Sequence, residues 1–420
     1  MKIISRIQSA LLYPMARAIV GAQSQRARLR SWGKAPRLHH EAPYEGQPIL
    51  LLALYQKGRL RPDLIRLIAA ARAQGLYVLA VNTLKVTAPD ALAGLVDCYI
   101  ERPNFGRDFG SYKTGFLHLY QRGWEARCPR LVMVNDSVYY STRGLAAFIE
   151  DLATCETEVL GATENYEIEY HLGSFCISMA GGILQSGRLR RYWRRYRLTD
   201  VRPLVIKRGE LGLSKTLKRC ASSEDDFASL FSAARFLSAI SADDQFMAFA
   251  MNNITTSRFN SARRPLFASI ARTFKDRYGV QTLAAEDLPK NSEMTLDSAL
   301  YDVSYVSDLD QLRAHFTRFL KTGDVQAGDL RTIAIAELGD RFLFGSHIHH
   351  NAAALLWLGV PFIKNDGLYR GAFSVEDVTR IGALLPPGEA REFMKLLLSR
   401  PYGGSTLRGW KLAAFAAGLI

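Results

Sequence analysis

The stretch "LVDCYIERPNFGRDFGSYKTGFLHLYQRGWEARCPRLVMVNDSVYY" (residues 95–140) indicates the fold more clearly than any other part of the chain. An apolar run (95–104) is followed by a helical pattern (110–123) that ends on a glycine, and then by a second apolar run (130–140). Strands that carry apolar residues without alternation are typical of a parallel sheet with helices on both faces. The stretch therefore predicts a strand–helix–strand unit of an α/β protein.

The same alternation extends to both sides of this unit. Short apolar runs predict further strands, and segments with helical spacing predict the helices between them. The predicted strands are 48–55, 76–83 and 158–165, and the predicted helices are 62–75 and 144–155. Ligands of such sheets bind at the carboxyl ends of the strands. We therefore expect the polar residues at 102–110 and 135–137 to lie at the site.

Composition narrows the classes of partner. The chain has 420 residues and carries 54 Lys and Arg against 40 Asp and Glu, a formal charge of +14. Such an excess favours an anionic partner: nucleic acid, an anionic membrane surface or a phosphorylated substrate. Five scattered cysteines without a Cys-x-x-Cys pair argue against a disulfide framework and against a zinc site, and favour a reducing compartment.

The first 44 residues form a basic extension. Residues 1–38 contain eight Lys and Arg and no acid, and no apolar run in the chain approaches the roughly 18 residues of a spanning helix. A stripe at i+4 spacing predicts an amphipathic helix that Pro14 would kink; its members are Ile3, Ile7, Leu11, Met15 and Ile19. The helix could lie in the plane of an anionic membrane or pack on the main domain, and we weigh the two interpretations equally.

The turn at 102–110 has two interpretations as well. Its glycines, Gly106 and Gly110, permit a close approach of the backbone, and the following helix offers free N–H groups to an anion. Arg107 and Lys113 add positive charge, and Asp108 could accept from a ribose or a base. These features suit a nucleotide diphosphate, but an Asp-capped turn would explain them equally well. The pattern matches neither a P-loop nor the dinucleotide fingerprint.

Asp136 follows the apolar run 130–135 and lies between Asn135 and Ser137. One carboxylate at a strand end with oxygen-bearing neighbours could form half of a Mg²⁺ or Mn²⁺ site, because such ions take further ligands from a substrate's phosphates. On its own, however, Asp136 is better interpreted as a helix cap or as part of an Asx-turn.

Several ordered motifs together resemble the rhamnan synthesis F family of bacterial polysaccharide glycosyltransferases. They are the Asn-x-Gly-x-Asp-Phe-Gly turn with its Tyr-Lys-x-Gly continuation, the Asn-Asp-Ser strand end, "YHLGSFCIS", "KRGELGLSKTL" and "PFIKNDGLYRG". The resemblance covers residues 45–215 well and 345–370 less well. It implies a GT-A-like, Rossmann-related, mostly parallel sheet flanked by helices, with additional helical segments.

The resemblance also implies roles for particular residues. Glu210 would be the base that takes the acceptor's proton, and His171 would face the acceptor with Ser174. A divalent metal, Mn²⁺ or Mg²⁺, would be held by Asp136, which His349 or His350 could join, although polar residues at a helix start are the slightly preferred explanation of those histidines. Ser137 stands where many such enzymes carry a second acid, and Gly173 departs from the family's usual Gln. The donor site would be lined by Asn104, Gly106, Arg107, Asp108, Lys113, Asn135, Ser137 and Lys364.

We therefore expect an inverting glycosyltransferase that moves a sugar, such as rhamnose from a dTDP donor, to a lipopolysaccharide- or capsule-type glycan. It would be cytoplasmic and peripheral on the inner face of the bacterial membrane, with "RLRRYWRRYR" (188–197) as a further lipid contact or a solvated helix face. The alternatives are an inactive binding or scaffold protein of the same fold and, less favoured, a nucleic-acid-binding protein.

The chain divides into four expected parts. The end of the last part, "RGWKLAAFAAGLI", is either a packed helix, which we favour, or a membrane contact. The parts are the extension (1–44), a nucleotide-sugar-binding core (45–220), a mostly helical acceptor region (221–340) and a C-terminal segment that completes the site (341–420).

Overall fold

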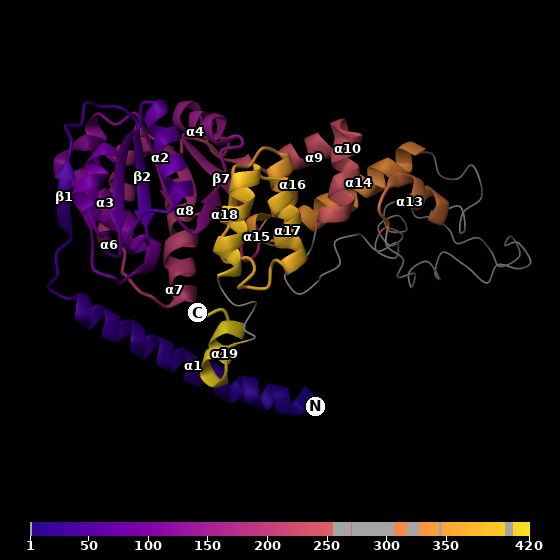
Figure 1. Cartoon of the computed structure of the whole chain (residues 1–420), viewed down its shortest axis with the longest axis horizontal. Helices are drawn as coiled ribbons and strands as arrows, with labels where there is room; N and C mark the ends of the chain where they lie inside the picture. The colour runs from indigo at the N-terminus through magenta and orange to yellow at the C-terminus, as the bar shows by residue number, and fades with distance from the viewer. Residues whose placement is uncertain (1, 255–269, 271–305, 317–326, 344–346, 400–405) are drawn as a thin grey trace, which may run out of the picture.

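The computed structural model describes residues 2–254, 270, 306–316, 327–343, 347–399 and 406–420, with side-chain environments from residue 13 onward. A nine-stranded sheet forms its centre (Figure 1). The strand order is β1-β4-β3-β2-β5-β9-β7-β10, and β8 pairs with β7. The strands are β1 (Arg37–Glu41), β2 (Ile49–Leu54), β3 (Tyr77–Asn82), β4 (Cys98–Glu101), β5 (Arg130–Asn135), β7 (Val159–Asn165), β8 (His171–Leu172), β9 (Cys176–Ala180) and β10 (Phe227–Phe231).

The predicted α/β class with a mostly parallel sheet is confirmed. β4, β3, β2, β5, β7 and β10 run in one direction, and only β1, β8 and β9 oppose them. The chain moves from β2 outward to β3 and β4, and then returns to β5 on the other side of β2. This order, 3-2-1-4 in sequence terms, places a topological switch point between β2 and β5, where ligands of open α/β sheets bind.

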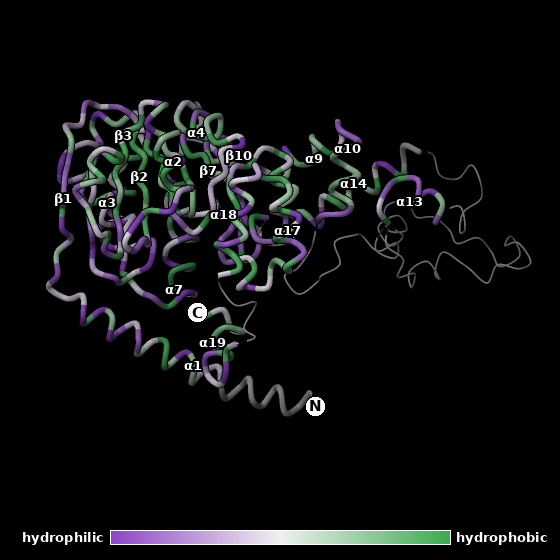
Figure 2. Tube along the Cα trace, viewed as in Figure 1, coloured by the Kyte–Doolittle hydropathy of each residue, from purple (hydrophilic) through white to green (hydrophobic). Residues whose placement is uncertain are grey.

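Helices cover both faces of the sheet, which explains why its strands lack alternation (Figure 1). Leu50 and Leu52 of β2 face one layer, whereas Ile49 and Leu51 face the other, and all four are fully buried. Hydrophobic residues are concentrated on the central strands (Figure 2). One layer contains α2 (Pro62–Ala73) and α4 (Leu145–Thr154), and the other contains α3 (Arg107–Arg122), α5 (Gly181–Gln185), α6 (Gly187–Arg195) and α8 (Leu211–Lys218).

The apolar run 130–140, predicted as one strand, forms two. β5 ends at Asn135 because the Asn135 side chain accepts a hydrogen bond from the Ser137 N–H at 3.1 Å and closes an Asx-turn. The chain then forms β6 (Val138–Tyr140), which pairs antiparallel with β11 (Phe362–Lys364) in a separate two-stranded sheet. This pairing brings the C-terminal part of the chain to the carboxyl end of β5.

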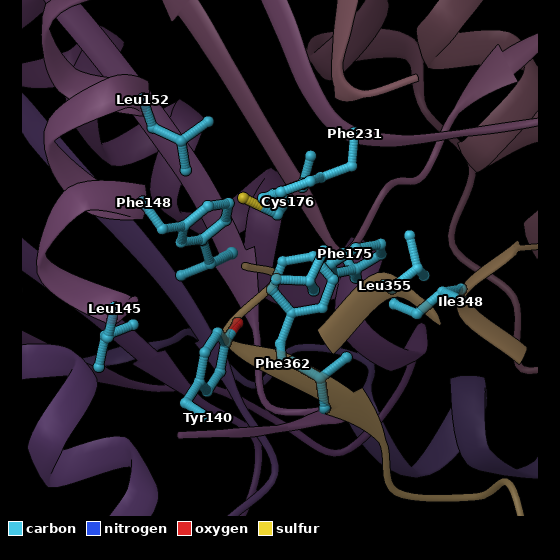
Figure 3. Close-up of a cluster of buried hydrophobic side chains, with 14 of the residues drawn as sticks. Tyr140, Leu145, Phe148, Leu152, Phe175, Cys176, Phe231, Ile348, Leu355 and Phe362 are labelled. Carbon is cyan, nitrogen blue, oxygen red and sulfur yellow. The ribbon is translucent and has the colours of Figure 1, made fainter. Parts of the chain in front are cut away.

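A hydrophobic cluster holds that C-terminal part against the core (Figure 3). Phe362 of β11 contacts Phe175 and Phe148, with ring centroids 5.0 and 5.3 Å apart. Ile348 and Leu355 join the same cluster from two short helices. The nearby helices are α15 (His347–His350), α16 (Ala352–Trp357), α17 (Val375–Ala383) and α18 (Pro387–Leu398).

The region 221–340 contains helices, as predicted, but it also supplies strand β10. Its described helices extend from the β10 side of the sheet (Figure 2). Residues 255–269, 271–305 and 317–326 of this region lie outside the described residues. The helices are α9 (Ala233–Ala242), α10 (Asp244–Asn253), α13 (Leu309–Phe316) and α14 (Ala327–Leu343).

The N-terminal extension forms helix α1 (Lys2–Ser31), with Pro14 inside it. It contacts α19 (Gly409–Ala416), which confirms that the C-terminal "RGWKLAAFAAGLI" forms a packed helix (Figure 1). Among the residues of α1 whose burial the structure describes, Ala16, Val20 and Ser24 are buried, whereas Met15 of the predicted stripe is 45% exposed. The packed stripe is therefore offset by one residue from the predicted one. None of the described helices has both the length and the apolar character that crossing a bilayer requires.

The turn between β4 and α3 is built around the buried guanidinium of Arg102. It donates to the carbonyl oxygens of Pro103 and Phe105 at 2.9 and 2.6 Å, to that of Arg107, and to the Ser111 hydroxyl at 2.8 Å. A Cβ at position 110 would lie 2.6 Å from Arg102 Nη1 and 2.8 Å from the Phe105 carbonyl oxygen. The absence of a side chain at position 110 thus makes room for the side chain of Arg102, and not for a bound ligand.

Gly110→Ala should therefore destabilise the protein by about 1–3 kcal/mol, because the added methyl group overpacks this turn. Chemical denaturation measures the change in the free energy of unfolding. Gly388→Ala in α18 is the matched control, since a Cβ there meets nothing within 4 Å, and it should be neutral or stabilising by up to about 1 kcal/mol. Equal stability of the two variants would contradict this account of the turn.

Candidate functional site

A cavity of about 310 Å³ lies at the carboxyl end of β5, beside the switch point of the sheet. It gathers residues from segments that are distant in the sequence, including most of those that the sequence predicts as functional. The predicted residues that line it are Arg107, Asp108, Asn135, Ser137, His171, Ser174, Glu210, His349, His350 and Lys364.

A chain of polar contacts crosses the floor of this cavity. Asn135 Nδ2 donates to Asp108 Oδ2 at 3.1 Å, and the Ser137 hydroxyl donates to Asn135 Oδ1 at 2.6 Å. Lys364 Nζ donates to the same Ser137 oxygen at 3.0 Å. These hydrogen bonds connect the start of α3, the end of β5 and the end of β11. They therefore fix the positions of the three segments around the cavity.

Glu210 and His171 face each other across the cavity. His171 Nδ1 lies 2.7 Å from the Glu169 carbonyl oxygen, which can only accept, so this nitrogen carries the proton. The other ring nitrogen, Nε2, faces Glu210 and lies 3.9 Å from its Oε2. Burial raises the pKa of Glu210, and the negative charge of Asp108 raises it further, against nearby cations. A carboxylate with a raised pKa is a stronger base than an ordinary one.

A rare helical geometry places Glu210. The segment Ile206–Glu210 is a π-helical turn, which follows the short helix α7 (Arg202–Val205) and precedes α8. Gly209 lies against the Phe109 ring, where a Cβ would be 2.7 Å from Cε2. Such single π-turns often occur at functional sites because they redirect one side chain without ending the helix.

Asp136 lies beside the cavity and is not one of the described residues that line it. Its Oδ2 accepts a hydrogen bond from the Tyr55 N–H at 2.7 Å and another from the Gln56 side chain. Arg61 donates to its carbonyl oxygen at 3.1 Å. Burial raises the pKa of Asp136, while Arg61 and the two hydrogen bonds oppose that shift. The carboxylate therefore connects the ends of β2 and β5.

Three residues that the sequence assigned to a donor site have structural contacts outside this cavity. Lys113 Nζ donates to the carbonyl oxygens of Arg194 and Tyr196 at 3.1 and 2.7 Å and so caps the end of α6. Gly106 adopts a φ of 94° and packs on Leu198, and its N–H donates to Asp200. Asn104 lines a different depression, between α1 and the end of β4.

The predicted metal ligands Asp136, His349 and His350 are not assembled into one ligand set among the described residues. His349 Nε2 instead lies 3.9 Å from Asp366 Oδ1. Although burial acts to raise it, the pKa of Asp366 is held below its usual range by surrounding cationic groups, Arg370 among them. The histidines thus line the cavity next to an ion pair, apart from the strand end that carries Asp136.

A different group of side chains could hold a metal ion. Glu41, Cys98 and His118 bring three ligand atoms within 4.8 Å of one another, where β1 pairs with β4 beneath α3. His118 Nε2 lies 2.6 Å from Glu41 Oε2 and 3.9 Å from Cys98 Sγ. The sequence argument against a zinc site considered only pairs of cysteines, so it overlooked a set that mixes three ligand types.

Sequence reasoning also missed four charged residues that line the cavity: Glu167, Arg202, Asp366 and Arg370. Asp366 and Arg370 follow the apolar run "PFI" at 361–363, where a strand ends, and that position was a usable signal. Arg202 precedes a proline in "DVRPLV", a context without a recognisable motif.

Comparison with known proteins places the chain beside two relatives without defining its family. It is 27% identical over 174 residues to the uncharacterized protein y4gN of Sinorhizobium fredii, and the match covers 40% of this chain and 45% of that protein. It is 33% identical over 119 residues to the virulence protein VirA of Vibrio anguillarum, with 28% and 38% covered. The chain thus spans less than half the length of these curated relatives. No family model matches it.

Because its carboxylate connects two strand ends, Asp136→Ala should lower the free energy of unfolding by about 1–3 kcal/mol, leaving the Tyr55 N–H without an acceptor. Asp225→Ala, at an exposed position, is the control and should stay within about 0.5 kcal/mol of the parent. Urea denaturation compares the two variants. If Asp136→Ala kept the parent's stability and lost Mn²⁺-dependent ligand binding, the metal role would replace the structural one.

Proposed function

We propose that this chain is an inverting glycosyltransferase of GT-A-like architecture that transfers a sugar from a nucleotide-diphosphate donor to a lipopolysaccharide- or capsule-type glycan. The observation that carries the proposal is the meeting of Asp108, Asn135, Glu210 and Lys364 in one cavity. These residues come from four separate motifs of the resemblance to the rhamnan synthesis F family. The Rossmann-related strand order and the position at its switch point support the same assignment.

The cavity offers the two functions that inverting transfer needs. Glu210 is the base that takes the proton from the acceptor hydroxyl as its oxygen attacks the anomeric carbon. His171, fixed through Glu169, orients toward that carboxylate and supplies a second polar contact. Arg107 and Lys364 provide positive charge for the diphosphate that leaves. Asp108 and Asn135, which bind each other, are placed to contact donor hydroxyl groups.

The resemblance also implies Mn²⁺ or Mg²⁺ on the donor diphosphate. The residues expected to hold it do not fit as a ligand set, because Asp136, His349 and His350 do not bring their ligand atoms together among the described residues. We therefore assign no step of the reaction to a metal, and the assays below are run both with Mn²⁺ and with a chelator.

An anionic membrane surface is the proposed location of the reaction. The α6 arginines Arg191 and Arg195 are exposed, whereas Leu189 and Trp193 of the same helix are buried, so α6 presents a basic face. Leu29 and Trp32, in and after α1, are 63% and 77% exposed among basic residues. Basic and exposed apolar side chains together favour the interface of an anionic bilayer.

Glu210→Gln should reduce sugar transfer by about 10²–10⁴-fold, since the amide cannot take the acceptor proton. The assay incubates the purified full chain with a panel of nucleotide sugars and follows donor hydrolysis and transfer to glycan acceptors. Glu167→Gln, in the same cavity, is the matched control and should change turnover less than about ten-fold. No donor turnover by the parent under any condition, with donors still bound, would favour the inactive binding protein that the missing second acid at Ser137 also suggests.

The double variant Leu29→Ser, Trp32→Ser should bind vesicles of phosphatidylcholine and phosphatidylglycerol about ten-fold more weakly than the parent, because two apolar anchors are lost. Val375→Ser, Leu398→Ser removes two side chains of similar exposure, 57% and 52%, from another surface and should bind like the parent. Co-sedimentation measures the bound fraction. Equal binding of both variants would contradict the proposed contact, and steep salt-dependent binding to DNA instead would favour the nucleic-acid alternative.

A further inference from the structure

One wall of the cavity carries three arginines from separate parts of the chain. Arg107 is the first residue of α3, Arg202 is the first residue of α7, and Arg370 follows β11 in the sequence. All three line the cavity. They lie close enough together that the positive charge of Arg370 acts on both of the other two.

Arg202 differs from the other two arginines in its contacts. Its guanidinium makes no hydrogen bond and no ion pair with any residue in the part of the chain that the structure describes. It is only partly exposed, and burial lowers its pKa, as do the like charges of Arg370 and Arg107, while the carboxylates of Asp366 and Glu210 act in the opposite direction. A partly desolvated guanidinium close to two others is costly, and an anion that contacted all three would reduce that cost.

Arg107 is held toward the cavity by an unusual backbone. Its φ of 50° makes it the one residue other than glycine with a positive φ among those described. Arg107 Nε donates to the Asp200 carbonyl oxygen at 2.9 Å, and its own carbonyl oxygen accepts from Arg102. Its two terminal nitrogens donate to no described residue. Left-handed backbone at a non-glycine residue tends to persist where function requires it.

Arg370 is fixed from several sides. Its Nε donates to Asp366 Oδ2 at 3.1 Å and its Nη1 to the Ile420 carbonyl oxygen at 2.6 Å, and the guanidinium lies over the Tyr369 ring. Asp366 binds Arg370 through one carboxylate oxygen, and Glu210 Oε2 lies 3.9 Å from His171 Nε2. Neither acid makes a direct contact with Arg202.

We infer that Arg202, together with Arg107 and Arg370 of the same cavity, forms an anion site for a diphosphate group and provides the positive charge that a metal would otherwise supply. The planar fork of a guanidinium matches the oxygens of a phosphate bidentately, and several forks around one cavity suit an anion with more than one phosphate. That the anion is a diphosphate belonging to a nucleotide sugar rests on the proposed function. The anion site itself does not depend on it.

Calorimetric titration of the full chain with inorganic pyrophosphate in EDTA tests this site. The parent should bind, Arg202→Ala should bind about 10–100-fold more weakly, and Arg202→Lys should recover part of the loss because it keeps the charge without the fork. Arg197→Ala removes an exposed arginine that lines other depressions and should bind like the parent. Thermal unfolding of each variant, expected to match the parent, separates loss of binding from loss of fold.

Two results would overturn the inference: pyrophosphate binding by the parent that needs Mn²⁺, or equal binding by the parent and Arg202→Ala. Donor turnover, measured separately, distinguishes this failure from that of the proposed function. Arg202-dependent pyrophosphate binding without turnover of any nucleotide sugar would support the anion site and reject the transferase. Turnover that Arg202→Ala leaves unchanged would support the transferase and reject the anion site.

Discussion

The buried guanidinium of Arg102 is the interaction on which the position of the candidate site depends. It binds three main-chain oxygens and the Ser111 hydroxyl, and so it fixes the turn between β4 and α3 from within. Burial lowers the pKa of Arg102 to about 10, which leaves it charged near neutral pH, and hydrogen bonds from a charged donor are strong. Because α3 begins in this turn, Arg102 also determines where Arg107 and Asp108 enter the cavity.

Much of the sheet could be predicted, because a parallel strand buried on both faces is short and wholly apolar. β2, β3 and β5 lie where such runs predict them. The same pattern also predicted which edge of the sheet carries the candidate site, since ligands bind at the carboxyl ends of parallel strands. The direction of β9 could not be predicted in this way, because an antiparallel strand between parallel neighbours shows the same apolar run.

The orientation of charged side chains was much harder to predict. Lys113 and Arg107 are six residues apart, yet Lys113 caps α6 whereas Arg107 lines the cavity. Lys364 reaches Ser137 only because β11 pairs with β6, a contact between residues 227 positions apart. Such long-range pairings depend on packing that the periodicity of the sequence does not encode. The sequence therefore predicted the edge of the sheet that carries the site better than it predicted the individual side chains that line the cavity.

The pairing of β11 with β6 also sets the order in which this protein can mature. A ribosome adds residues one at a time, and the N-terminal strands can begin to associate while later ones are still being made. The wall that contains Lys364, Asp366 and Arg370 reaches β5 only after β11 and the residues that follow it have been made. Until then the nascent chain lacks one wall of the cavity, and the apolar surface that Phe362 covers in the folded protein is exposed. The candidate cavity is therefore complete only once segments far apart in the sequence have all been synthesised.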